Sequence, residues 1–386
     1  MQTANKLGSF NAYQGPAMNQ KIALMKADGK DVINLGLGDP DFNPPEHVLK
    51  ALADTTLSSG YHHYPSAYPL KPFYEAIADW YRRRHGVEVD PETEVLYCLG
   101  AAEGLFQLPN CLLNPGDTAL VSNPAYPSYE AAVKMAGGKV ESYPLLMENN
   151  FLPDLDTITS DVANRAKMIW INFPNNPTAA VAGEEFYKKL IDWAKEYNVV
   201  VISDNPYMDI CLDGYKPPSF LSVPGAKEVG VELNSMSKSF NCCGWRVGML
   251  LGNNEIISAM AKVKSHSDRG LYYPLQVAAI AAFTGPVDWM DERNKTFAER
   301  RDVIVRAWQK MGLEMMTPKA TFYCWGKIPH GYTSREFCLK FLEEENVWMI
   351  PGSTYGERGE GFVRISCVQS TERAAEAMER MERFIA

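Results

Sequence analysis

One lysine lies in a sequence setting that suits covalent chemistry. Lys238 is surrounded by small hydroxyl residues, including Ser235 and Ser237, and Arg246 follows eight residues later. A lysine amine forms a Schiff base with an aldehyde when neighbouring cations and partial burial lower its pKa. Arg246 would supply such a cation, together with a fork for phosphate oxygens. Most lysines are only solvated surface charges, so the other turns must decide between the two interpretations.

Four further turns place polar or aromatic residues directly after runs that we predict as strands. In chain order these residues are Gly100, Ala101 and Ala102, then Tyr126, then Asn176, then Asp204 and Tyr207. Taken singly, each has a plain structural explanation: a tight turn, a core aromatic, an Asn-Pro turn and a helix cap. Ligands of open α/β sheets, however, bind beyond the carboxyl ends of the strands. We therefore consider the five turns together.

Together these turns offer the groups that one cofactor requires. They provide an amine for an aldehyde, a carboxylate for a ring nitrogen, an amide and a phenol for a ring hydroxyl, and an aromatic plate for stacking. Backbone amides at a helix start, two hydroxyls and an arginine remain for a phosphate. This set matches pyridoxal 5′-phosphate, whose ring accepts electrons from the carbanion at the substrate Cα.

The elements that must position these residues alternate along the chain. Short apolar runs that read as strands cover residues 95–99, 118–122, 168–172, 199–203, 229–233 and 246–251. Longer stretches with helical spacing lie between them, such as residues 183–197, where Phe186, Leu190 and Trp193 fall three to four apart. This alternation predicts an α/β fold with a mostly parallel sheet and helices on both faces.

The chain changes character near residue 286. A long charged helix candidate covers residues 288–312, short strand-like pieces cover 321–325 and 362–365, and a helix rich in Glu and Arg ends the chain. We expect a large cofactor-binding domain over residues 51–285 and a small α+β domain over 286–386. The N-terminal residues 1–50 are expected to form an arm and part of the small domain.

Composition excludes several classes of protein. The 386 residues are 46% hydrophobic and 22% charged, as in soluble globular proteins. A net charge of -9 without a basic block argues against nucleic acid, and the absence of a long apolar segment or leader argues against a membrane. We expect a cytoplasmic protein with eight reduced cysteines. The histidines and cysteines lack metal-ligand spacing, so no metal is expected.

A longer motif resembles a known family. The pattern S-x-S-K-x₅-G-x-R spans Ser235 to Arg246, and further segments agree with it: GDPDF, NPAYPSY, NFPNNPT, SDNPY, PGSTYG and GFVRIS. On these segments nearly the whole chain resembles the fold-type I pyridoxal-phosphate enzymes of the class I/II aminotransferase family. The spelling GAAEG, with NPAYPSY and HHYPSAYPL, is most similar to the branch of LL-diaminopimelate aminotransferases and related alanine or branched-chain aminotransferases.

The resemblance implies a role for each matching residue. Lys238 binds the cofactor aldehyde and moves the proton between Cα and C4′, with Asp204 at the pyridine nitrogen and Tyr207 at the ring hydroxyl. The implied cofactor contacts are Gly100, Ala101, Ala102, Tyr126, Asn176, Ser235, Ser237 and Arg246, with Tyr64 reaching over from a second subunit. The implied substrate contacts are Arg364, which grips the α-carboxylate, and Gly38, Asn176 and Tyr126. The resemblance thus implies a homodimer with shared active sites.

The chain also departs from the family pattern. Ala101 and Ala102 stand where members commonly have Ser with Lys or Thr, and Ala179 replaces the usual Gly after NPT. The segment after Tyr64 shows Tyr68, Pro69 and Tyr74 in place of a Gly and an Arg. These departures leave the lysine, the aspartate and the carboxylate-binding arginine intact. Their effect on the substrate pocket stays open, as does the role of Cys242 and Cys243.

The implied reaction is transamination in two half-reactions, which moves the amino group of an L-amino acid to a 2-oxo acid. A β-lyase or decarboxylase on the same scaffold is the first alternative, and a non-catalytic sensing domain is the second. We hypothesise that Arg269 lies at the subunit interface and holds the phosphate or a distal substrate carboxylate. Glu103 is either a contact for a distal ammonium or an ordinary helix-start glutamate. The identity of donor and acceptor stays open.

Overall fold

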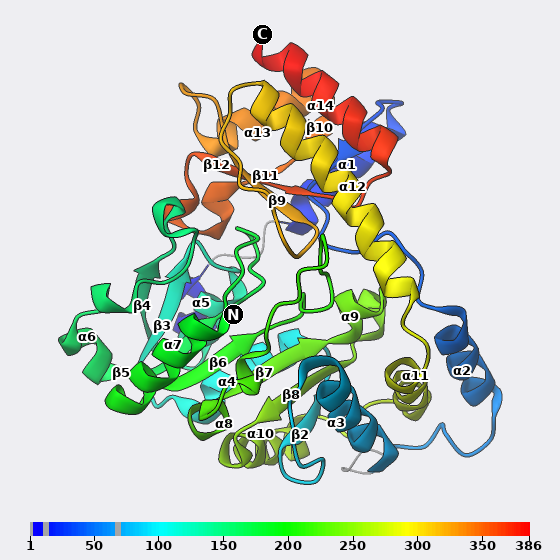
Figure 1. The fold of residues 1–386 in the computed structure, drawn as a ribbon, viewed down its shortest axis with the longest axis vertical. Helices are drawn as coiled ribbons and strands as arrows, with labels where there is room; N and C mark the ends of the chain where they lie inside the picture. The colour runs from blue at the N-terminus through cyan, green and yellow to red at the C-terminus, as the bar shows by residue number, and fades with distance from the viewer. Residues whose placement is uncertain (1–2, 11–14, 66–70) are drawn as a thin grey trace.

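The computed structural model describes residues 3–10, 15–65 and 71–386 of the chain. Two lobes make up the molecule (Figure 1). A seven-stranded sheet with its helices forms one lobe, and helices α12 (Trp289–Lys310), α13 (Ser334–Glu345) and α14 (Thr371–Ile385) cover the small sheets of the other. The long charged helix expected at residues 288–312 is thus α12, and the terminal helix is α14.

The large sheet has the strand order β2-β8-β7-β6-β5-β3-β4. Every neighbouring pair in it is parallel except those of β8, which runs antiparallel to β2 and β7. The α/β fold class predicted from the alternating pattern is confirmed. The strands are β2 (Val95–Cys98), β3 (Thr118–Asn123), β4 (Lys139–Pro144), β5 (Ala166–Ile171), β6 (Val200–Asp204), β7 (Gly230–Ser235) and β8 (Gly248–Gly252).

Six of these strands agree with the predicted runs to within two residues. The seventh, β4, was missed because it is an edge strand whose sequence KVESYP has no continuous apolar run, and most of its side chains reach solvent. The central strands are the opposite case: almost every residue of β5, β6 and β7 is buried. Burial on both faces is typical of parallel sheets covered by helices, and it explains why these strands read as apolar runs.

Several helices of the large lobe pack on this sheet, with α4 and α10 against β8 and α3 against β2, whereas α2 packs on α11. In α7 the buried stripe runs through Tyr187, Leu190 and Ile191, whereas Phe186 and Trp193, on which the prediction was based, are only partly buried. The remaining helices are α1 (Gly15–Ala27), α2 (Glu46–Leu57), α3 (Lys71–His85), α4 (Ala101–Leu112), α5 (Ser128–Met135), α6 (Ser160–Arg165), α7 (Glu184–Tyr197), α8 (Ala226–Val229), α9 (Met236–Ser239), α10 (Asn254–Ser267) and α11 (Tyr273–Thr284).

The second lobe is built from both ends of the chain. Strand β1 (Ile33–Asn34) pairs in parallel with β10 (Val347–Trp348), and β9 (Tyr323–Lys327), β12 (Phe362–Ser366) and β11 (Ile350–Pro351) form an antiparallel sheet. Its buried apolar residues come from 22–35 and 297–381, joined by three from the middle of the chain, Tyr207, Ile210 and Leu212. The turn after β6 therefore belongs to the core of the other lobe.

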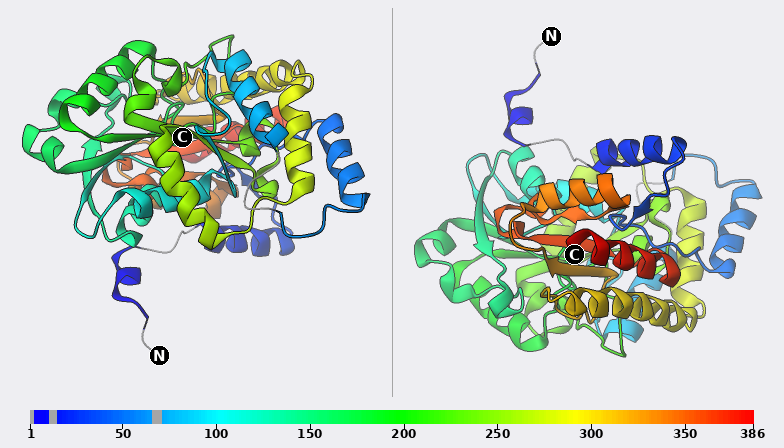
Figure 2. Two further views of the ribbon diagram at one scale, coloured as in Figure 1. Left: turned by 90° about the horizontal axis from the view of Figure 1, so that it is seen from below. Right: turned by 90° about the horizontal axis from the view of Figure 1, so that it is seen from above.

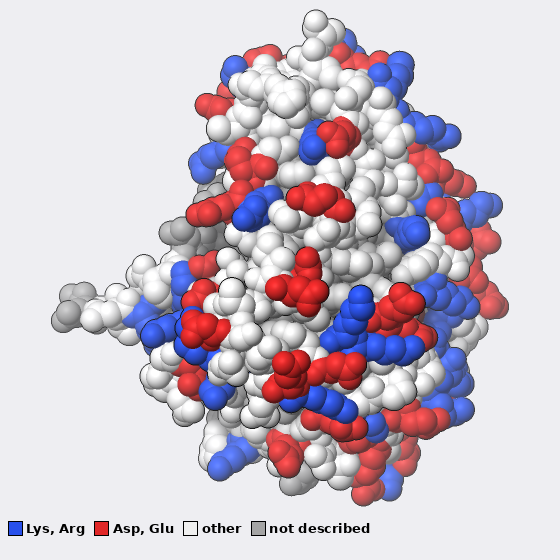
Figure 3. Space-filling model, turned by 60° about the vertical axis from the view of Figure 1, so that its left-hand side comes forward, with Lys and Arg blue, Asp and Glu red and all other residues white. Residues whose placement is uncertain are grey.

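Four surface and composition features complete the description. Acidic and basic side chains are interspersed over the face shown in Figure 3. In the described part of the chain, no helix combines the length and apolar character needed to cross a membrane. The same residues contain no group of three or more His, Cys, Asp or Glu arranged to hold a metal ion. All eight cysteines are free thiols, and the cytoplasmic location stays a prediction.

Candidate active site

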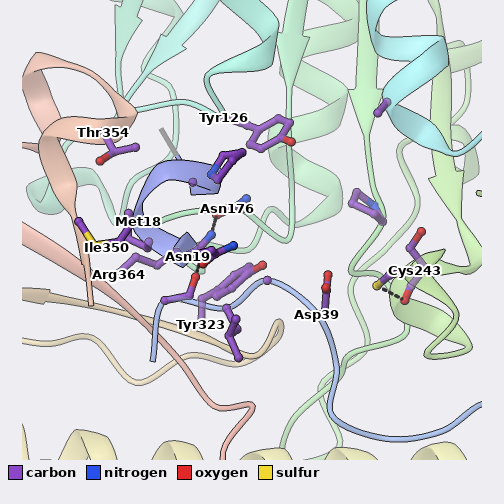
Figure 4. Close-up of a pocket in the computed structure, with 18 of the residues that line it drawn as sticks. Met18, Asn19, Asp39, Tyr126, Asn176, Cys243, Tyr323, Ile350, Thr354 and Arg364 are labelled. Atoms are coloured by element: carbon purple, nitrogen blue, oxygen red, sulfur yellow. Dashed lines mark hydrogen bonds between the residues drawn. The ribbon is translucent and has the colours of Figure 1, made fainter. Parts of the chain in front are cut away.

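A cavity of about 950 Å³ opens between the two lobes. The large lobe contributes residues that follow the strands of its sheet, and the small lobe contributes Arg364 and Tyr323 (Figure 4). Most residues predicted for the site line this cavity: Gly38, Ala101, Ala102, Tyr126, Asn176, Asp204, Tyr207, Ser235, Ser237, Lys238, Arg246 and Arg364. The fold thus brings together residues spread over more than 300 positions of the chain.

Parallel strands explain why these side chains meet. Strands β5, β6 and β7 run in the same direction, so their carboxyl ends reach one edge of the sheet. Asn172 follows β5, Asp204 ends β6 and Ser235 ends β7. Asn172 also joins two of the turns, because its Nδ2 donates to the Asp204 carbonyl (2.6 Å) and its Oδ1 accepts from the Asn176 N–H (2.8 Å).

Asp204 is a buried carboxylate with one oxygen left over. Its Oδ2 accepts a hydrogen bond from the Tyr129 hydroxyl at 2.6 Å, and its Oδ1 has no hydrogen-bond partner among the described residues. Burial raises the pKa of Asp204 to about 6, against the lowering effect of the Tyr129 hydrogen bond. A protonated pyridine nitrogen would supply the missing donor and the missing positive charge, so this site fits the ring of pyridoxal 5′-phosphate.

This buried carboxylate predicts a pH dependence of stability for the cofactor-free protein. Because the folded-state pKa lies above the ordinary value of 3.8, the stability that Asp204 contributes is present below that value and is lost as the pH rises through about 6. Asp204→Asn keeps an acceptor for Tyr129 but cannot ionise. Urea unfolding should therefore show wild type losing about 2 kcal/mol relative to Asp204→Asn between about pH 4 and about pH 6.5. A constant difference across that range would contradict the assignment.

Lys238 lies in the short helix α9 with its amine directed into the cavity. The Nζ atom donates to the Gly38 carbonyl and to Cys243 Sγ (3.3 Å), and it lies 3.6 Å from Asp39 Oδ1. Burial is the largest influence and lowers the pKa of Lys238, but Tyr323, Cys243 and Asp39 together raise it above its ordinary value. The expectation that neighbouring cations lower this pKa is therefore wrong for the free lysine.

Arg246 is directed to the turn before α4. Its guanidinium lies against Gly100, where a side-chain Cβ would collide with it, and Gly100 itself has φ +75°, which favours glycine. Ser235 and Ser237 lie nearby with their hydroxyls 2.8 Å apart. A cation, two hydroxyls and the start of α4 thus face one space, and this donor set fits a phosphate.

Arg364, on strand β12, presents a guanidinium fork to the cavity. Its Nη1 donates to Asn176 Oδ1 and its Nη2 to the Gly36 carbonyl, both at 2.9 Å, and its guanidinium carbon lies 4.1 Å from the centre of the Tyr323 ring. The side chain is 5% exposed although it lies on strand β12. A buried, oriented guanidinium of this kind suits the bidentate binding of a substrate carboxylate.

The two groups predicted for the ring hydroxyl are both in place. The Tyr207 hydroxyl lies 3.1 Å from that of Tyr323, and burial raises the pKa of Tyr207 well above its ordinary value. Asn176 Oδ1 accepts a hydrogen bond from Arg364, so the side-chain nitrogen of Asn176 remains as the donor for a ligand oxygen. Tyr126 lines the cavity with its ring 5.8 Å from that of Tyr129. Whether these groups contact the cofactor stays a prediction.

Four candidate residues do not line the cavity: Gly100, Tyr64, Arg269 and Glu103. Tyr64 is 85% exposed, and Arg269 is also exposed. Glu103 lies in the first turn of α4, where its carboxylate accepts from the Leu99 N–H and binds Lys264. This pairing agrees with the helix-start interpretation of Glu103, and a contact with a distal substrate ammonium stays a prediction. The hydroxyl of Tyr74, on α3, accepts a hydrogen bond from the Tyr97 N–H. Tyr68 and Pro69 lie outside the described residues.

Sequence reasoning missed three residues of the site. Tyr129 holds Asp204 and stacks on Trp170, and it was visible in the segment NPAYPSY as a second tyrosine without an assigned role. Tyr323 joins Tyr207 to Arg364, but its segment TFYCW reads only as a strand. Cys243 contacts the amine of Lys238 because α9 is followed by a tight turn, a proximity that spacing alone does not reveal.

The departure at Ala179 has a visible cost. Ala179 adopts φ +58°, the left-handed region that glycine occupies without strain, and it is buried next to the NFPNNPT turn. Ala179→Gly should therefore raise the free energy of unfolding by about 1 kcal/mol, the strain of one alanine in this region. Denaturant titration would measure the gain. A loss of stability would mean that the buried methyl group contributes more than the strain costs.

Fold and cavity together define the class of this protein. The family model for aminotransferase class I and II matches residues 30–381. Because this match covers most of the chain, the protein belongs to the class I and II aminotransferase family.

Individual relatives show which aminotransferases the chain is similar to. The chain is 46% identical to an LL-diaminopimelate aminotransferase of Aquifex aeolicus, covering 98% of each chain. It is 43% identical to an LL-diaminopimelate aminotransferase of Halothermothrix orenii, covering 99% of this chain and 98% of the relative. Among solved structures, apo-BacF from Bacillus subtilis has a TM-score of 0.96 at 38% identity, over 100% of this chain and 98% of that chain.

These findings confirm that the protein is an aminotransferase that uses pyridoxal 5′-phosphate. The relatives bear the names of aminotransferases rather than of lyases, decarboxylases or sensing proteins. The predicted reaction class is therefore confirmed, and amino acids with 2-oxo acids are its substrates.

Proposed function

We propose that the enzyme transfers an amino group from LL-diaminopimelate to a 2-oxo acid. The observation that carries this choice of donor is the name shared by relatives that match the chain end to end at 40–46% identity. The cavity supports it, because beyond Arg364 it extends to α1 and α13, where Lys21 and Arg335 line it. A long donor with a second carboxylate would find both space and positive charge there.

A donor screen tests this proposal. Purified enzyme is supplied with LL-diaminopimelate, meso-diaminopimelate, L-alanine, L-leucine or L-glutamate, and a 2-oxo acid acceptor, and the aminated product is quantified. The proposal requires the highest kcat/KM for LL-diaminopimelate. Turnover of L-alanine or L-leucine with an inert LL-diaminopimelate would assign the enzyme to the alanine or branched-chain group instead.

The residues of the cavity have separate roles in the reaction. When bound, pyridoxal 5′-phosphate supplies an aldehyde for the amino group and a ring that stabilises negative charge at Cα. Lys238 Nζ would move the proton between the substrate Cα and the cofactor's C4′ carbon, the two carbons on either side of the transferred nitrogen. Asp204, with its unpaired Oδ1, keeps the ring nitrogen protonated, and Arg364 orients the α-carboxylate.

We further infer that two copies of the chain form the working enzyme. Three exposed features support a second copy: the 85% exposed Tyr64, the exposed Arg269, and the 3-10 turn η1 (Asn5–Ser9), which has no buried residue and projects from the body (Figure 2). In this arrangement Tyr64 serves the phosphate of the other subunit, and Arg269 lies at the interface.

Mixing two inactive variants tests the shared site. Tyr64→Ala and Lys238→Ala each lack one component, and a mixed dimer restores one complete site. Recovery of activity on mixing supports the dimer, while a monomer by sedimentation velocity that retains activity refutes it. Arg269→Ala should weaken cofactor affinity or alter donor preference, and a variant without either effect would remove Arg269 from the site.

A further inference from the structure

A buried cation lies outside the cavity and is used by none of the steps above. Lys264, on α10, is 2% exposed. Its Nζ lies 2.7 and 2.8 Å from the two carboxylate oxygens of Glu103 and 2.7 Å from Asp268 Oδ2, and it lies 4.1 Å from the centre of the Tyr97 ring. We call these four residues the Lys264 cluster. None of them lines the cavity.

One end of the Lys264 cluster holds the turn that leads into α4. Glu103 Oε2 accepts from the Leu99 N–H at 2.6 Å, and the Glu103 N–H donates to the Gly100 carbonyl at 3.2 Å. Gly100 is the N-cap of α4 and has no side chain to cap the helix. The Glu103 carboxylate, which Lys264 holds in place, thus supports the backbone of residues 99–102 from outside the cavity.

This turn carries the phosphate donors of the cofactor site. Ala101 and Ala102 line the cavity but have no polar side chains, so they offer only backbone N–H groups. The quality of such donors depends on where the backbone lies, and an error of a few tenths of an ångström weakens several hydrogen bonds together. In this chain the geometry of the turn has to replace the missing side chains.

The other end of the Lys264 cluster holds the segment after α10. Asp268 Oδ1 accepts from the Gly270 N–H at 2.9 Å and from the Tyr97 hydroxyl. Asp268 is the C-cap of α10, and its N–H donates to the Lys264 carbonyl at 3.0 Å. One ammonium group therefore fixes both the turn before α4 and the chain that carries Arg269.

We propose that Lys264 is a positioning residue for the phosphate end of the cofactor site. Through Glu103 it holds the backbone donors of residues 99–102 in the arrangement that binds phosphate, and through Asp268 it anchors this arrangement to α10. Loss of Lys264 leaves two carboxylates without their common cation, so Glu103 leaves the Leu99 N–H and the turn relaxes.

The test compares two ligands that differ only in the phosphate. Cofactor-free Lys264→Met is titrated with pyridoxal 5′-phosphate and with pyridoxal, and tryptophan fluorescence reports the dissociation constants. The proposal requires the constant for pyridoxal 5′-phosphate to rise about tenfold or more, as expected when hydrogen bonds to an anion are lost, with the constant for pyridoxal unchanged. This readout is independent of which amino acid is the donor.

A matched control separates positioning from general loss of stability. Arg301, on α12, is also a buried cation, 3% exposed, that pairs with two carboxylates, Asp213 and Asp302, at 2.6 and 2.7 Å. Arg301→Met should lower the melting temperature and leave both dissociation constants unchanged. If Lys264→Met raises both constants by the same factor, or raises neither, the proposal is wrong.

A second variant covers the case in which Lys264→Met does not fold. Glu103→Gln leaves Lys264 paired with Asp268, so no buried charge is left without a partner. If its amide oxygen takes the place of Oε2, which accepts from both Leu99 and Lys264, its NH₂ group must face the Lys264 ammonium in place of Oε1, so the side chain can no longer be held as the carboxylate is in the wild type. The affinity for pyridoxal 5′-phosphate should fall while that for pyridoxal stays constant. Unchanged affinity for both ligands in folded Glu103→Gln would overturn the proposal.

Discussion

Lys238→Ala is expected to reduce transamination by about 10⁴-fold or more, because it removes both the covalent anchor and the group that moves the proton at Cα. The described structure offers no ready substitute within reach. The nearest polar neighbours of the Lys238 amine are the Gly38 carbonyl, the Cys243 thiol and the Asp39 carboxylate. Burial raises the pKa of Cys243, which keeps it a thiol at neutral pH.

Lys227→Ala is the matched control for this prediction. Lys227, on α8, is not among the residues that line the cavity, and it pairs with Glu94 at 2.8 Å. Its loss should leave kcat close to that of the wild type. The measurement is the rate of a single half-reaction, followed through the visible absorbance of the cofactor. A Lys238→Ala variant with more than a small fraction of the activity would remove this lysine from the mechanism.

Arg364→Met is expected to lower kcat/KM for amino acids by roughly 10²- to 10³-fold, the usual cost of leaving a buried carboxylate without its charged partner. The loss should fall mainly on KM, because Arg364 binds the α-carboxylate in the ground state as well as in the transition state. Cofactor affinity should change little, since Arg364 lies on β12 of the small lobe, whereas the predicted phosphate donors follow strands of the large sheet.

Arg364→Lys distinguishes charge from geometry. Lysine keeps the positive charge but cannot reach Asn176 and the Gly36 carbonyl while also offering two parallel donors to a carboxylate. We expect an activity between those of wild type and Arg364→Met. Equal activity of Arg364→Lys and wild type in steady-state assays would show that only the charge at this position matters.

The sequence predicted the large sheet well because its strands are buried on both faces. Strands β5, β6 and β7 consist of apolar runs that end at polar residues, and the residues after them point to the site. The strand β4 escaped prediction because an exposed edge strand has no such run. The pattern of side-chain burial thus decided which strands could be recognised.

Site residues were predictable where a motif fixes them and not where tertiary contacts do. Lys238 and Arg246 share one motif, and both line the cavity. The pKa of Lys238, however, depends on Tyr323, 85 residues further along the chain, and on Asp39 in the N-terminal region. The pairing of Glu103 with Lys264 likewise joins two helices that are distant in sequence. Electrostatic environments of this kind arise only when the lobes have come together.

The pairing of β1 with β10 has a consequence for the synthesis of the protein on the ribosome. Ile33 pairs with Val347, and the Leu35 carbonyl accepts from the Ser366 N–H. The N-terminal segment therefore lacks its partners until nearly the entire chain has been made, and contacts this distant in sequence form late. The nascent chain can complete its large sheet first. The fork of Arg364, bonded to the Gly36 carbonyl, is then among the last parts of the enzyme to assemble.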